Sequence, residues 1–206
     1  LNDEVYWFDI NDKYDGIETA PYVLTYDIPV KVTKYSYSTD AAEIDQILQD
    51  IIPELKKQTP VTSEEFEDFS AWINQSIALL HYIELKEYFD NGIDENYYFK
   101  KFNVNTQQLN QDIDQQISNV FEQSEAGLGG DSFDQEMDLM EQTETILFDN
   151  IKKVADKHQL SLLVVYRENP YWLLVPTTND AELSLIVTAF NQAFNEDGDL
   201  NMVVYE

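Results

Sequence analysis

Residues 145–176, TILFDNIKKVADKHQLSLLVVYRENPYWLLVP, decide the fold class of this chain. The first part of this stretch spaces its apolar residues three and four apart, which predicts an amphipathic helix. Residues 160–166 and 171–175 are then two short, mostly apolar runs separated by Glu168-Asn169-Pro170, which predicts two strands joined by a turn. A helix followed by two adjacent strands is typical of an α+β protein.

The same patterns extend the prediction to both sides of this stretch. Residues 181–194 have helical spacing and 200–205 form a closing strand, so 131–206 is predicted to be a helix-strand-strand-helix-strand module. Residues 40–126 are a helical middle, in which one broad apolar stripe runs along a single helix from Phe66 to Leu85. Residues 1–39 are predicted to form N-terminal strands, because apolar residues alternate with others over 24–32.

The glycines at 127, 129 and 130 are the best candidate for a linker. They divide the chain into 1–126, which holds the N-terminal strands and the helical region, and the α+β module 131–206. The two parts form separate domains or pack together as one.

The net charge of −28, from 40 acidic and 12 basic residues, bounds the partners of this protein. Nucleic acid and anionic lipid need Lys and Arg to neutralise phosphate, so the composition excludes direct binding to either and favours a basic protein. No apolar run reaches the roughly 18 residues of a membrane span. We therefore expect a soluble, cytoplasmic protein. The charge is uneven, because the chain carries eleven acids and no base between Lys101 and Lys152.

The sequence offers little for catalysis. The absence of cysteine excludes disulfides and thiolate chemistry, and His81 and His158 lie far apart, on predicted helices, without the spacing of a zinc site. The glycine run is followed by Asp131-Ser132, which suits helix capping and not phosphate binding. We expect no cofactor, no metal and no enzymatic activity, although so many acids leave a carboxylate-based hydrolase open as an alternative.

In composition the chain resembles bacterial toxin-immunity proteins and protein DNA mimics, which are small, acidic and without catalytic motifs. That resemblance implies an inhibitory protein that docks on a basic partner, such as a nuclease-type toxin. The alternative is a structural or regulatory domain of a salt-adapted cell, whose acids would be spread evenly. The residues predicted to bind the partner are Asp112, Asp114, Glu122, Glu125, Asp131, Asp134, Glu136, Asp138 and Glu141.

Overall fold

The computed structural model describes residues 41–58, 65–86, 92–127, 133–177, 179–195 and 198–206. By the density of its contacts the chain divides into two units, Leu1–Ser36 and Tyr37–Glu206. The predicted N-terminal strands lie outside the described residues. All elements below belong to the second unit.

The described residues confirm the α+β class. The strands are β1 (Leu80–Tyr82), β2 (Leu160–Tyr166), β3 (Tyr171–Pro176) and β4 (Asn201–Val204). The helices are α1 (Ala41–Ile51), α2 (Phe66–Ile73), α3 (Tyr97–Lys101), α4 (Thr106–Gly127), α5 (Phe133–Lys157) and α6 (Asp180–Phe194). Two 3-10 turns are also present, η1 (Pro53–Lys57) and η2 (Ile93–Glu95).

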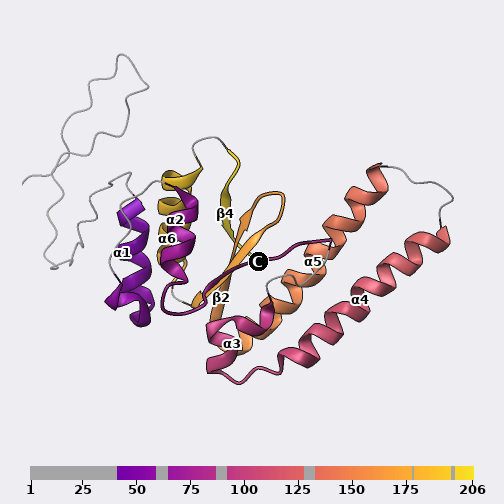
Figure 1. Cartoon of the computed structure of the whole chain (residues 1–206), viewed down its shortest axis with the longest axis horizontal. Helices are drawn as coiled ribbons and strands as arrows, with labels where there is room; N and C mark the ends of the chain where they lie inside the picture. Colours follow the sequence, from indigo (N-terminus) through magenta and orange to yellow (C-terminus); the bar gives the residue numbers. More distant parts are fainter. Residues whose placement is uncertain (1–40, 59–64, 87–91, 128–132, 178, 196–197) are drawn as a thin grey trace, which may run out of the picture. The chain divides into compact units, whose positions relative to one another are not determined.

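The four strands form one antiparallel sheet in the order β1-β3-β2-β4, with helices on both of its faces (Figure 1). On one face, Phe66 of α2 packs edge-on against Tyr171 of β3, with ring centroids 5.0 Å apart. On the other face, Phe99 of α3 lies 5.9 Å from Trp172. Neighbouring residues of a strand point to opposite faces, so helices on both sides explain why the strands are apolar at almost every position.

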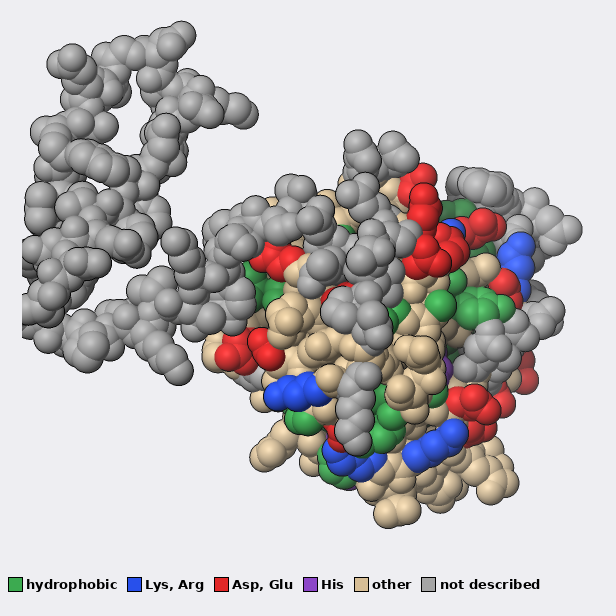
Figure 2. Space-filling model, turned by 60° about the vertical axis from the view of Figure 1, so that its left-hand side comes forward, with side chains coloured by type: hydrophobic (Ala, Val, Ile, Leu, Met, Phe, Trp, Pro, Cys, Tyr) green, Lys and Arg blue, Asp and Glu red, His purple; other side chains and the backbone are tan. Residues whose placement is uncertain are grey.

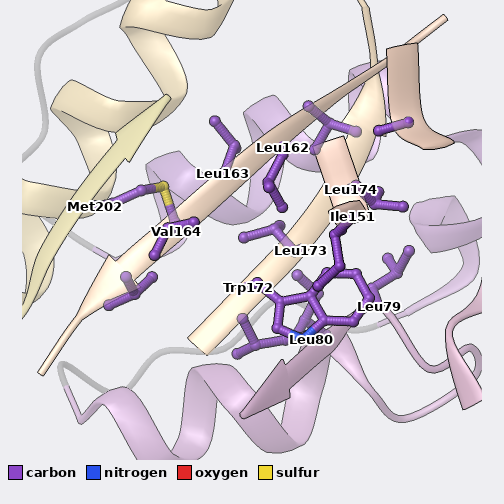
Figure 3. Close-up of a cluster of buried hydrophobic side chains, with 14 of the residues drawn as sticks. Leu79, Leu80, Ile151, Leu162, Leu163, Val164, Trp172, Leu173, Leu174 and Met202 are labelled. Atoms are coloured by element: carbon purple, nitrogen blue, oxygen red, sulfur yellow. The ribbon is translucent and has the colours of Figure 1, made fainter. Parts of the chain in front are cut away.

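The core centres on Trp172, whose side chain is fully buried. Figure 3 shows Trp172 in a cluster of buried side chains that also includes Leu80 and Ile151, so β1, β3 and α5 contribute to one core. Four consecutive residues of β2 are buried as well. Burial of such a continuous apolar run is the main stabilising contribution to the fold.

Each edge strand of the sheet is bonded on its outer side by an asparagine side chain. On β1, Asn74 Oδ1 accepts hydrogen bonds from the backbone N–H groups of Leu79 and Leu80, both at 2.9 Å, and Asn74 Nδ2 donates to the Leu80 carbonyl at 2.7 Å. On β4, Asn191 Oδ1 accepts from the Met202 N–H at 2.7 Å, while Asn191 Nδ2 donates to the Met202 carbonyl at 3.0 Å. The two carboxamides therefore take the place that a further strand's peptide would occupy.

The predicted C-terminal module is confirmed, element by element. The predicted helix from Phe66 to Leu85 is wrong, because α2 ends at Ile73 and residues 80–82 form β1. Asn74 ends the helix by bonding the backbone ahead of it, and the apolar run that follows suits a strand as well as a helix. Because β1 pairs with β3, residues from both sides of the glycine run build one sheet.

Both histidines were expected on helices, and neither is on one. His81 lies on β1, is 7% exposed, and its Nε2 is 3.2 Å from the Ala78 carbonyl oxygen. His158 lies in the turn after α5, with its ring stacked on that of Phe102 at a centroid distance of 4.6 Å. Both rings thus lie against neighbouring residues of the fold.

Candidate functional site: the acidic helical hairpin

Helices α4 and α5 lie side by side as a hairpin and contain most of the predicted binding residues (Figure 1). α4 faces the core with Leu109, Ile113 and Ile117, which are spaced four apart and buried. The Gln116 and Asn150 side-chain amides exchange two hydrogen bonds of 3.4 Å between the helices. These contacts hold one side of α4 inward and leave its other sides to solvent.

The acidic residues of α4 surround its exposed sides. Successive helical residues are rotated by about 100°, so Asp112 and Asp114 lie on opposite flanks of the buried Ile113. Glu122 follows nine residues after Ile113, about 180° away, on the outermost side. All three residues are exposed. The helix thus presents carboxylates in three directions, without gathering them into one cluster.

On α5 the structure places Asp138 and Glu141 three residues apart and exposed. Residues three apart are neighbours on a helix surface, so these two carboxylates form one local patch. Glu125, Asp134 and Glu136 lie within the two helices, where only the backbone is described, and Asp131 lies outside the described residues. Five of the nine predicted side chains are therefore placed, and all five are exposed.

Two further acidic residues of α5 were missed as site residues. Burial, and then the charge of Glu141, raise the pKa of the half-buried Glu144 carboxyl. The Asp149 carboxylate accepts a hydrogen bond of 3.1 Å from the Tyr205 hydroxyl, and the pKa of Tyr205 is raised by burial first and then by the Asp149 charge. The spacing of Glu141 and Glu144 could have indicated the first pair, but the second depends on the placement of the C-terminal strand.

Basic residues gather at the end of the hairpin where α4 begins and α5 ends. The ring stack of Phe102 and His158 joins the end of α3 to the end of α5. Lys101 forms a 3.0 Å ion pair with Glu54 of η1. The half-buried Glu54 carboxylate also accepts a 2.6 Å hydrogen bond from the Tyr97 hydroxyl. The exposed lysines of these helix ends are Lys100, Lys101, Lys153 and Lys157. The charge of the hairpin thus changes along its length, from mixed at this end to purely acidic beyond it.

Acidic residues are not confined to the hairpin. Figure 2 shows red acidic side chains in several separate patches, while the blue basic side chains lie mostly in its lower part. Asp50 on α1, Glu67 on α2 and Glu182 on α6 are exposed as well. The hairpin is distinguished by its lack of bases over a long stretch, since acidic residues occur on most elements.

The described residues contain no group of three His, Asp or Glu side chains able to hold a metal ion. Within the same part of the chain, no helix combines the length and apolar character required to cross a bilayer. No protein family model, curated protein or solved structure matches the chain. A proposal about function must therefore be argued from the geometry and charge of the hairpin.

Proposed function

We propose that the α4–α5 hairpin binds a basic protein and thereby inhibits it. The single observation that carries this proposal is the run of eleven acids without a base between Lys101 and Lys152. Its described part forms two neighbouring helices, on which the five placed carboxylates of the predicted site are exposed. Opposite potentials speed the encounter of two proteins and orient them as they approach. The lysines at the other end of the hairpin repel a cationic partner, so they favour one direction of approach.

The kind of partner follows from the same charge pattern. Nucleases and other nucleic-acid-binding proteins present basic clefts that accept a line of phosphates. Exposed carboxylates along two helices fit such a cleft and block it. A nuclease-type bacterial toxin is our first candidate, with the protein acting as its immunity protein or as a DNA mimic in the cytoplasm, where the toxin would meet nucleic acid.

The experiment compares two variants of equal net charge. The hairpin variant neutralises the five placed residues, as D112N, D114N, E122Q, D138N and E141Q. The control variant neutralises five exposed acids on other elements, as D50N, E67Q, E168Q, E182Q and D199N. Immobilised proteins are exposed to lysate of the native host and eluted with rising salt. Captured proteins are identified and tested for nucleic-acid cleavage with and without the wild-type protein.

We expect the wild type and the control variant to retain the same basic protein and to inhibit it. The hairpin variant should bind it roughly tenfold more weakly, since each charge pair removed at an interface costs a fraction of a kcal/mol or more. Equal losses in both variants would refute the hairpin as the binding surface. That result would favour a general acidity of the kind expected in a salt-adapted cell.

A further inference from the structure

A cavity of about 690 Å³ lies beside the edge strand β1, and none of its described wall residues belongs to the hairpin. Its wall is built by the end of α2, by β1, by the turn η2 and by one residue of β3. A space of this size is within the range of small-molecule sites. The polar and aromatic residues of the wall that matter here are Ser70, Asn74, Tyr82, Asp94, Glu95 and Tyr171.

Two tyrosines form an aromatic corner of the cavity. Tyr82 and Tyr171 are paired across β1 and β3, and their ring centroids are 5.8 Å apart with the planes tilted by 44°. The π faces of aromatic rings attract cations. Tyr171 already shows this behaviour, because the Arg167 guanidinium lies 5.7 Å from its ring centroid. Arg167 is not among the described wall residues, whereas both Tyr82 and Tyr171 are.

The turn η2 brings two carboxylates to the same wall. Gly92 has a φ of +56°, a conformation that glycine adopts readily, and the chain turns there into Asp94 and Glu95. Asn110 Nδ2 donates a 3.4 Å hydrogen bond to Asp94 Oδ1 and orients that side chain. Among the wall residues that the structure describes, His81 alone is able to carry a positive charge. The described part of the wall therefore combines two aromatic rings with two carboxylates.

We infer that this cavity binds an organic cation, an alkylammonium or guanidinium group whose apolar body contacts the tyrosines while its charge meets Asp94 and Glu95. Rings and carboxylates around one cavity are the usual recognition elements for such groups. The group can belong to a free amine or to a lysine or arginine side chain. This inference does not depend on the hairpin proposal, because the two sites share no residue.

The test uses butylammonium as the probe and butanol as its neutral analogue, followed by amide NMR in about 150 mM NaCl, which screens loose counterion binding. We expect butylammonium to shift the resonances of Tyr82, Gly92 and Tyr171 saturably, and butanol to leave them in place. A blocked lysine tripeptide is the second probe. Tighter binding of the tripeptide indicates a protein side chain as the natural ligand, and tighter binding of butylammonium a free amine.

Two double variants of equal charge separate a built site from general attraction to an acidic protein. D94N/E95Q should weaken butylammonium binding about fivefold, the equivalent of roughly 1 kcal/mol. D138N/E141Q, on α5 of the hairpin, should change it less than about twofold. Equal weakening by both, or shifts spread over all acidic surfaces, would overturn the inference. If D94N/E95Q does not fold, E95Q alone replaces it, with E141Q as its match.

Discussion

The side chain of Asn74 offers the sharpest test of how this fold is held together. The Asn74→Ala substitution removes the three hydrogen bonds to Leu79 and Leu80, whose lengths are 2.7 to 2.9 Å. One intramolecular hydrogen bond contributes about 1 kcal/mol net, which would give roughly 3 kcal/mol for three. Asn74 is exposed, so in the variant water can bond the freed backbone groups and recover part of this free energy. We expect the free energy of unfolding to fall by about 2 kcal/mol.

The assay is urea denaturation followed by circular dichroism, with Gln75→Ala as the matched control. Gln75 is the next residue and is also exposed, so its truncation should change stability by less than about 0.5 kcal/mol. Backbone strain does not confuse the comparison, because Asn74 has a φ of −96° that alanine adopts without cost. The slope of unfolding free energy against urea should stay the same in both variants.

Amide hydrogen exchange locates the effect. In Asn74→Ala the N–H groups of Leu79 and Leu80 should exchange much faster than in the wild type, while Trp172 in the centre of the sheet changes only with global stability. Two results would refute the reasoning. One is a stability loss no larger than that of Gln75→Ala. The other is a large loss with unchanged exchange at Leu79 and Leu80.

Three further predictions concern α6, η1 and α5. Asn191→Ala loses two hydrogen bonds to β4 and should cost about 1.5 kcal/mol in urea denaturation, with the exposed Gln192→Ala near zero. Glu54 has a lowered pKa, chiefly from its hydrogen bond with a tyrosine hydroxyl, and also bonds Lys101. Glu54→Gln should therefore cost about 1 kcal/mol at pH 7, and the difference should vanish as acid protonates the carboxylate. Glu144 has a pKa raised by burial, so its charged form opposes folding. Glu144→Gln should therefore raise the free energy of unfolding at pH 7 in the same assay. This advantage should disappear below about pH 4, where the carboxyl is neutral in both the folded and the unfolded chain.

The elements that were predicted correctly are those whose residue pattern fits only one kind of secondary structure. Strands β2 and β3 were found because they are apolar at almost every position and are bounded by Glu168-Asn169-Pro170. Strand β1 was missed because it has three residues and continues the spacing of α2. Its pairing with β3 is a contact between segments about 90 residues apart, which no local pattern contains.

The candidate site divides in the same way. The exposure of Asp112 and Asp114 follows from their positions beside Ile113 on an amphipathic helix, so it could be predicted. The hydrogen bond between Asp149 and Tyr205 could not, because it depends on the register of β4 against β2. The cavity beside β1 could not be predicted either, because its wall comes from four elements, α2, β1, η2 and β3, that are separated in the sequence.

The asparagine carboxamides on the sheet's two borders restrict how another molecule can attach. A foreign strand seeking to lengthen the sheet would have to dislodge Asn74 from Leu80 at one border, or Asn191 from Met202 at the other. It would exchange an intramolecular bond for an intermolecular one and gain little. The two edges of this sheet are therefore poor places for a strand to add, and the same barrier opposes edge-to-edge pairing between the sheets of two copies.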